Sequence, residues 1–141
     1  MRTLYLAGLI LLLGACAAPA PAVVTPVPTT WPEGQTYRAA SVTEDGQDRP
    51  PVPDTELRFR FDRPGFIVVD AGCNTIGVSS RLDDGRMTEV GFTGTAMACA
   101  PERLDQDAWL VEFFSAGPTV DIAAGAVVLT TPDAEIRLVP A

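Results

Sequence analysis

The sequence contains no histidine and no lysine, so its ten basic residues are all arginines. Without histidine, the chain lacks Ser-His-Asp and Cys-His nucleophile systems and every zinc site that uses imidazole, which are the commonest catalytic arrangements. It also lacks a glycine-rich phosphate loop and an EF-hand pattern, since Asp83-Asp84-Gly85 is typical of a hairpin turn. We therefore predict a protein that is not an enzyme and holds no cofactor or metal.

Carboxylates are the most numerous of the remaining side chains that could act as general acids or bases. The 18 acidic residues outnumber the 10 basic ones, which gives a formal net charge of −8 at pH 7. Asp70, Glu89 and Asp121 would serve a glycoside hydrolase only at a defined separation, and nothing in the sequence places any two of them there. An unrecognised hydrolase is kept as an alternative, and the acidity excludes nucleic acid as an expected partner.

No apolar run is long enough to cross a membrane. Residues 4–13 follow Arg2 and end at Leu13-Gly14-Ala15-Cys16, well short of the about 18 residues of a span. Residues 1–15 are therefore predicted to be a secretory signal peptide. Its ending resembles the lipobox of bacterial lipoproteins, which implies a diacylglycerol thioether on Cys16, cleavage after Ala15 and acylation of the new amino group. The alternative is an ordinary secreted protein with an incidental cysteine.

Residues 16–30 are rich in proline and alanine and have no helical or strand period, so we expect a lipidated tether that holds the domain clear of the headgroups. Two or three acyl chains bind a membrane firmly, whereas a domain this acidic is not expected to lie flat on anionic lipid. Ala17, not aspartate, follows Cys16, and resemblance to Gram-negative sorting signals implies the outer membrane, facing the periplasm.

The number of cysteines is consistent with an exported protein. If Cys16 carries lipid, Cys73 and Cys99 remain as an even pair in an oxidising compartment, where a disulfide is expected. Two free buried thiols and a redox-active pair are the alternatives. The close Cys-x-x-Cys spacing typical of redox pairs is absent from the sequence.

Residues 31–141 are long enough for one domain with a single core. Apolar alternation and turn residues predict strands at 36–43, 55–61, 66–69, 75–80, 88–93, 119–123, 126–131 and 135–139. The alternation is clearest at 55–61, where apolar and charged side chains take turns without a break.

One helix is predicted, at residues 101–115, with Pro101 in its first turn and Gly117-Pro118 as its stop. The stripe expected to pack on the sheet consists of Leu104, Ala108 and Val111, widened by Leu110 and Phe114. Trp109 and Phe113 lie off this stripe and form a candidate surface for an apolar peptide or lipid. The alternative is that both extend the contact of the helix with the core.

Two short motifs, Ala71-Gly72-Cys73-Asn74 and Thr95-Ala96-Met97-Ala98-Cys99, precede the helix and the final strands. In that order they resemble the META domain family, which includes the HslJ-like bacterial heat-shock lipoproteins, over about residues 34–140. The resemblance implies a mainly β (α+β) fold: a compact antiparallel barrel-like sheet, here of about seven or eight strands, with one packed helix. It also implies association with the cell envelope and no established catalytic residues.

The motif residues also have structural explanations of their own. Gly72 is expected to adopt a positive φ or to permit close strand approach, and Asn74 to hydrogen-bond neighbouring backbone groups in a turn. Met97 is predicted to be a core residue, and Thr95 to share the structural role of its motif. The alternative for Asn74 is that it faces a ligand.

The predicted function is that of a noncatalytic envelope lipoprotein, binding or chaperone-like, in envelope stress tolerance. Its expected partners are the membrane, through the N-terminal lipid alone, and envelope proteins or an apolar peptide or lipid. A structural envelope component without a specific ligand is the alternative. We expect a monomer.

Overall fold

The computed structural model describes residues 30–123 and 125–141 of the chain, so the predicted signal peptide, Cys16 and residues 17–29 of the tether lie outside the described residues. The strands found in this range are β1 (Gln35–Glu44), β2 (Gln47–Asp48), β3 (Arg58–Arg63), β4 (Phe66–Asp70), β5 (Thr75–Asp83), β6 (Arg86–Gly94), β7 (Thr119–Ala123), β8 (Ala126–Thr130) and β9 (Ala134–Pro140). The helix of this range is α1 (Pro101–Ser115), which is not long and apolar enough to cross a membrane.

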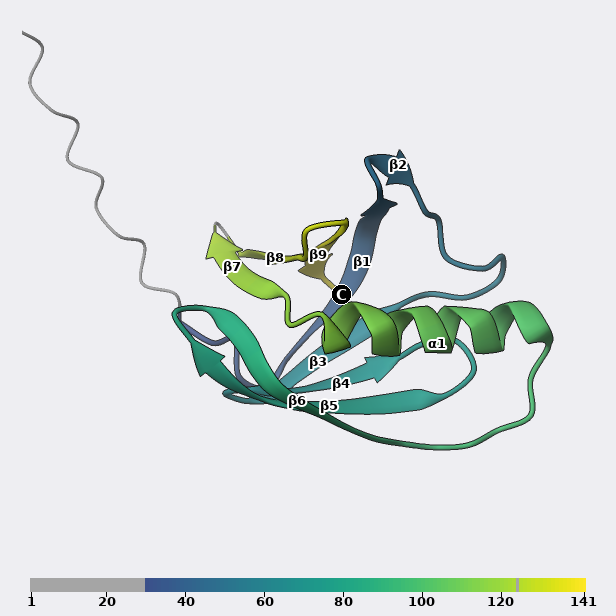
Figure 1. Ribbon diagram of the computed structural model, residues 1–141, viewed down its shortest axis with the longest axis horizontal. Coiled ribbons are helices and arrows are strands. Elements are labelled where there is room, and N and C mark those ends of the chain that lie inside the picture. The colour runs from purple at the N-terminus through teal and green to yellow at the C-terminus, as the bar shows by residue number, and fades with distance from the viewer. Residues whose placement is uncertain (1–29, 124) are drawn as a thin grey trace, which may run out of the picture.

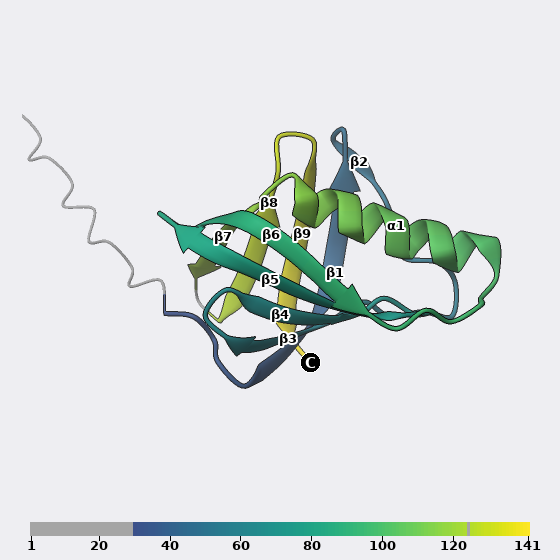
Figure 2. The ribbon, with the colours of Figure 1, turned by 60° about the horizontal axis from the view of Figure 1, so that its bottom comes forward.

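The strands form one antiparallel sheet that closes on itself (Figures 1 and 2). Its order is β2-β1-β3-β4-β5-β6-β7-β8-β9, and β1 also pairs with β9, with Tyr37 opposite Pro140 and Glu44 opposite Ala134. This arrangement confirms the predicted fold class, a mainly β (α+β) barrel-like sheet with one packed helix. The strand that the sequence did not predict is β2, whose two residues pair with the end of β1.

The core lies inside the ring and is built from alternate residues of the strands. In β3, Phe59 and Phe61 are fully buried, whereas the arginines beside them face solvent. On β4, Val69 lies opposite Phe59 and Ile67 lies opposite Phe61, and both are fully buried as well. Burial of each such side chain contributes about 1.5–3 kcal/mol, so the alternation predicted from the sequence also explains what holds these strands together.

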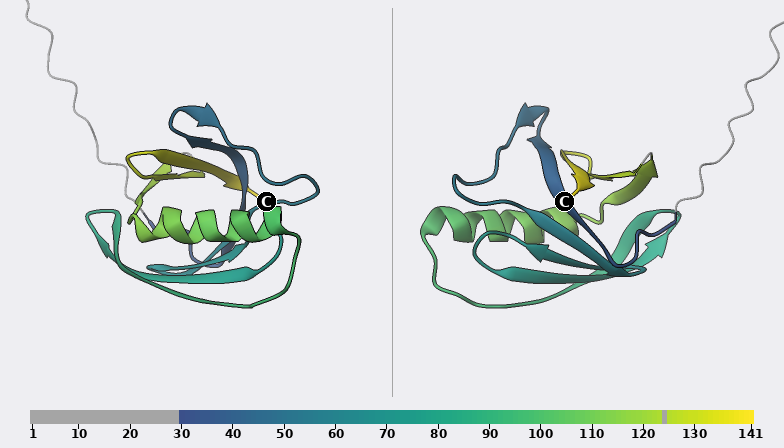
Figure 3. Two further views of the ribbon diagram at one scale, coloured as in Figure 1. Left: turned by 45° about the vertical axis from the view of Figure 1, so that its right-hand side comes forward. Right: turned by 180° about the vertical axis from the view of Figure 1, so that it is seen from behind.

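Helix α1 has the predicted bounds and lies beside β6, across the ring (Figures 2 and 3). Its inward face consists of Gln106, Asp107, Leu110, Phe113 and Phe114. Leu110 and Phe114 were predicted correctly, but Leu104 is 40% exposed and Ala108 is exposed. Val111 is half-buried and packs against the core, so the stripe was wrong only at Leu104 and Ala108. Polar groups of a neighbouring loop and turn lie under this part of the helix, where Gln106 and Asp107 bind them.

The ring is least complete between β6 and β7, the two strands that α1 connects in sequence. Their register contains a single pair, Arg86 with Thr119, and beside it the Met87 N–H donates to the Pro118 carbonyl at 2.9 Å. From Thr88 to Gly94, the edge of β6 that faces away from β5 pairs with no strand among the described residues. A length of free strand edge therefore lies beside α1.

Candidate functional site

The two cysteine motifs meet at one end of the ring. Cys73 and Cys99 form a disulfide with their Cα atoms 6.1 Å apart, as the cysteine count predicted. The bond connects the turn that follows β4 to residues 95–100, which lead into α1. It therefore holds the end of β6 and the start of the helix against the same turn.

Gly72 has the positive φ that was one of the two alternatives expected of it, and its close neighbour is a loop side chain, not a strand. Its φ is +86°, a conformation that glycine adopts without steric cost. A Cβ atom at this position would lie 2.7 Å from the side chain of Thr55, so a larger residue would have to displace that neighbour. The Gly72 carbonyl oxygen accepts a hydrogen bond from Arg103 Nη1 at 3.3 Å, which connects the turn to α1.

The Asn74 side chain connects three segments, rather than only its own turn as the sequence predicted. Its Oδ1 accepts hydrogen bonds from Thr95 Oγ1 at 2.9 Å and from the Met97 N–H at 2.7 Å. Its Nδ2 donates to Asp107 Oδ2 on α1 at 2.7 Å. An amide side chain can accept and donate at once, which is why asparagine suits this junction.

Met97 is 56% exposed, so its prediction as a core residue was wrong. The reason is that its backbone N–H, and not its side chain, is held by Asn74. Residues 95–99, which follow β6, contact the turn at residues 71–74 through backbone groups and the disulfide. The side chains of residues 95–98 are exposed to solvent. Thr95, in contrast, has the expected structural role, since its hydroxyl also accepts a hydrogen bond from the Thr75 N–H at 3.1 Å.

Asp107 is the most unusual polar group of the site. It is only 8% exposed, and its Oδ1 has no hydrogen-bond partner among the described residues. Buried polar atoms normally find a partner, and one left without costs about 1–3 kcal/mol. Nothing in the local sequence around Asp107 indicates a candidate site residue.

Asp107 and Asn74 lie at the wall of a groove between β6 and α1 with a volume of about 350 Å³. The lining residues are Asn74, Ile76, Phe92, Thr93, Gly94, Thr95, Asp107, Ala108 and Val111. Two residues of the predicted stripe, Ala108 and Val111, line the groove on the α1 side. Phe92, which is 37% exposed, lines it on the β6 side. The groove thus has an apolar wall at Ala108, Val111 and Phe92 and one carboxylate, that of Asp107.

The free edge of β6 presents backbone groups along this groove. The Thr95 N–H donates to the Thr75 carbonyl on the β5 side at 3.1 Å, and bonded pairs alternate with non-bonded pairs along an antiparallel ladder. Gly94 and Phe92 are therefore in non-bonded positions, and their N–H and C=O groups point away from β5. Such an edge is a template for one further strand.

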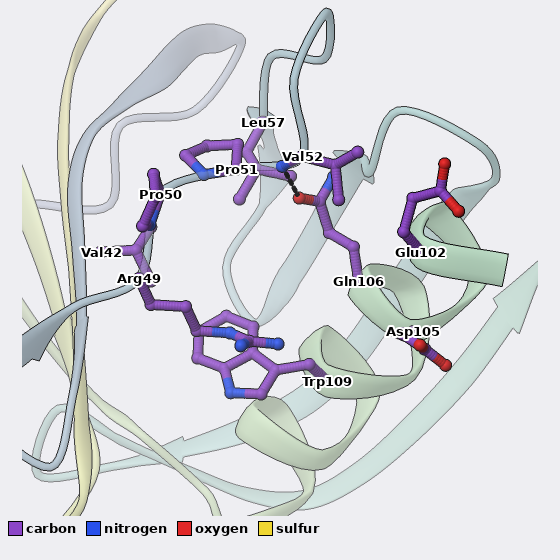
Figure 4. A pocket seen from close by; sticks show the side chains of 10 residues that line it. All are labelled: Val42, Arg49, Pro50, Pro51, Val52, Leu57, Glu102, Asp105, Gln106 and Trp109. Carbon is purple, nitrogen blue, oxygen red and sulfur yellow. Dashed lines mark hydrogen bonds between the residues drawn. The ribbon is translucent and has the colours of Figure 1, made fainter. Parts of the chain in front are cut away.

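A second pocket, of about 220 Å³, lies on the opposite side of α1, under the proline-rich loop that precedes β3 (Figure 4). Gln106 fixes this loop to the helix. Its Oε1 accepts a hydrogen bond from the Val52 N–H at 2.7 Å, and its Nε2 donates to the Ala71 carbonyl at 2.7 Å. The buried polar atoms of Gln106 are thus satisfied within the protein, which suits a structural role.

Trp109 lines this second pocket and is held by two partners. Its Nε1 donates to Glu44 Oε1 at 2.6 Å, and the Arg49 guanidinium carbon lies 4.6 Å from its ring centroid. Phe113 is 4% exposed and stacks on Trp109 with ring centroids 5.5 Å apart. Phe113 is therefore a core residue, the alternative considered above, and the two aromatic rings do not form a shared exposed surface.

Two of the three carboxylates considered from the sequence, Asp70 and Glu89, have local partners. Asp70 Oδ1 accepts a hydrogen bond from the Gly72 N–H at 3.1 Å, and Glu89 lies 3.4 Å from Arg81. Asp84 and Gly85 have φ of 46° and 79° and form the turn between β5 and β6. Within residues 30–123 and 125–141, no three histidine, cysteine, aspartate or glutamate residues are grouped as metal ligands. The groove beside β6 is the feature that best fits a functional site.

These features define a class of protein: a mainly β domain, closed into a ring, with a helix at its seam and a disulfide-linked Gly-Cys-Asn turn. The META domain profile matches residues 30–141, and the chain therefore belongs to the META domain family.

Two structures solved by NMR share the fold. One, of a protein from Burkholderia xenovorans, is 18% identical, with 89% of this chain and 97% of that chain covered and a TM-score of 0.58. The other is 21% identical over 77% of this chain and 90% of that chain, also with a TM-score of 0.58. No curated protein matches the sequence significantly. At these identities the likeness concerns the fold alone.

Proposed function

We propose that the protein is a noncatalytic binding protein of the cell envelope with a chaperone-like role in stress tolerance. In this proposal, acyl chains on Cys16 hold it at the outer membrane, facing the periplasm, and the tether carries the domain away from the lipid. The ligand is an extended apolar chain that binds in the groove between β6 and α1.

The observation that carries the proposal is an apolar helix stripe, exposed at Leu104 and Ala108 and half-buried at Val111, beside a free strand edge. Leu104, Ala108 and Val111 lie along one side of α1, and Ala108 and Val111 line the groove together with Phe92. Contiguous exposed apolar surface with polar residues at its border typically marks an interaction site. A purely structural envelope component, the alternative, would have no use for such a groove.

Photo-crosslinking in cells that express the full chain tests whether a ligand binds in the groove. A photoreactive amino acid in place of Ala108 is expected to form discrete adducts, because this residue is exposed and lies at the edge of the groove. The matched control is the same amino acid in place of Glu102, which is exposed on the side of α1 that faces the second pocket. Adducts are detected by gel mobility and mass spectrometry.

The proposal is supported if position 108 forms adducts that position 102 does not form and that Val111→Glu removes. The charge introduced at Val111 would lie in the apolar wall and should exclude an apolar ligand. Equal labelling at both positions, or no adduct at position 108, would favour the structural alternative.

The lipid anchor has its own test. Cys16→Ser is expected to move the protein from the membrane fraction to the soluble fraction, because serine cannot form the thioether that carries the acyl chains. Cell fractionation measures the shift, and the intact mass of the unaltered protein is the control. An unaltered mature protein whose first residue carries no lipid mass would contradict the proposed location.

A further inference from the structure

We infer that the ligand of the groove is an extended polypeptide segment that adds to β6 as a strand and donates a hydrogen bond from a lysine side chain to Asp107 Oδ1. The inference rests on the proposed function and specifies the chemistry of its ligand. Three features meet in the groove: a free strand edge, an apolar wall and a buried carboxylate oxygen without a donor.

The strand edge favours a polypeptide over an acyl chain. The N–H and C=O groups of Phe92 and Gly94 point along the free edge of β6. A peptide strand would pair with them, whereas an acyl chain would remove them from water and leave them without partners. Alternate side chains of an added strand would face Phe92 and the apolar side of α1, since side chains alternate between the faces of a sheet.

Asp107 specifies a donor on the ligand. A carboxylate only accepts hydrogen bonds, and Oδ1 has none although the residue is 8% exposed. Oδ1 belongs to a residue that lines the groove, and the other oxygen of the same carboxylate is held by Asn74 at 2.7 Å. Asn74 thus holds the carboxylate in place, and because Oδ1 is itself buried, the ligand reaches it only when a neighbouring side chain moves aside.

The charges of the groove favour a cation as this donor. Asp107 is the only charged residue among those that line the groove, and the chain as a whole carries a formal charge of −8. Because Asn74 already occupies Oδ2, one oxygen remains for the ligand. The compact ammonium group of lysine fits a single oxygen, whereas the guanidinium of arginine is suited to binding both oxygens of a carboxylate.

The test uses the full processed chain in phosphatidylcholine nanodiscs and a short fluorescent peptide, blocked at both ends, that alternates valine and threonine around one lysine. Binding is followed by fluorescence anisotropy. We expect the same peptide with norleucine in place of lysine to bind about 10- to 100-fold more weakly, the loss expected for a hydrogen bond to a charged group. Methylation of alternate backbone nitrogens on the pairing edge of the peptide is expected to abolish binding.

Substitutions in the protein, combined with the two peptides, give a double-mutant cycle for the contact between lysine and Asp107. Asp107→Asn is expected to weaken binding of the lysine peptide about tenfold or more and to make the lysine and norleucine peptides bind equally. The matched control is Asp105→Asn, because Asp105 is exposed and faces the second pocket. This control should keep both affinities.

Equal binding of the lysine and norleucine peptides to the unaltered chain would overturn the inference, even if Asp107→Asn failed to fold. Adducts from position 108 to nanodisc phospholipid that excess lysine peptide does not suppress would also overturn it. In that case the proposed function would stand, because the groove would hold an acyl chain. Absence of any adduct, together with absence of peptide binding, would overturn both.

Discussion

Replacement of Cys73 and Cys99 together by alanine is expected to lower the free energy of unfolding by about 3.5 kcal/mol. The cysteines are 26 residues apart, and closing a loop of that length removes about this much conformational entropy from the unfolded chain. Small domains have net stabilities of about 5–15 kcal/mol, so the variant should lose a large fraction of the total. Urea unfolding followed by tryptophan fluorescence measures the difference.

Reduction of the unaltered protein with dithiothreitol is the control for this experiment, because it opens the same loop without changing a side chain. Both samples should lose a similar amount of stability. If both lose less than about 1 kcal/mol, the disulfide does not constrain the unfolded chain, and the explanation from loop closure is wrong.

Asn74→Ala is expected to lower the free energy of unfolding by about 3 kcal/mol. The substitution removes the Nδ2 donor from Asp107, a carboxylate that is 8% exposed and has no other hydrogen-bond donor among the described residues. It also removes the acceptor that binds Thr95 and the Met97 N–H. Chemical denaturation of the variant and of the unaltered protein measures the loss.

Thr95→Val provides a matched comparison, since with little change of volume it removes two hydrogen bonds, one donated to Asn74 and one accepted from the Thr75 N–H. It should cost about 1–2 kcal/mol. Adding Asp107→Ala to Asn74→Ala should recover part of the loss, because the unpaired carboxylate is then gone. If Asn74→Ala costs no more than Thr95→Val, the Asn74 amide does not support the carboxylate in the way described.

Most of the elements could be predicted because they depend on neighbours in the chain. Pro101 and Gly117-Pro118 bound the helix at the predicted residues, and the alternation at 55–61 identified the buried side of β3 even though this strand begins later, at Arg58. The disulfide followed from the number of cysteines and the expected compartment. The helix bounds and the buried side of β3 could thus be predicted from short-range patterns, and the disulfide from the cysteine count.

The candidate site could not be predicted in the same way because it depends on contacts between distant residues. Asn74 and Asp107 are 33 positions apart, and nothing in the local pattern of either residue indicates the other. The predicted stripe of α1 assumed an apolar surface beneath the whole helix. The available signal was the spacing of Leu110, Phe113 and Phe114 with residues 106 and 107, which places all five on one face.

The free edge of β6 could not be predicted from the sequence either. Alternation at residues 88–93 correctly indicated a strand, but periodicity does not say which strands become neighbours. The edge is free because α1 follows β6 in the chain. The next strand, β7, pairs with β6 only through Thr119 and Arg86. Chain connectivity, rather than the composition of β6, leaves this edge open.

Closure of the ring by β1 and β9 has a kinetic consequence. The pairing joins residues separated by roughly a hundred positions, from Tyr37 to Pro140, whereas the hairpins of β3 to β6 join near neighbours. Distant contacts form slowly, since the intervening chain must first lose its freedom. Until β9 arrives, one side of β1 stays open to strands of other molecules, so aggregation during maturation should compete with folding at this strand.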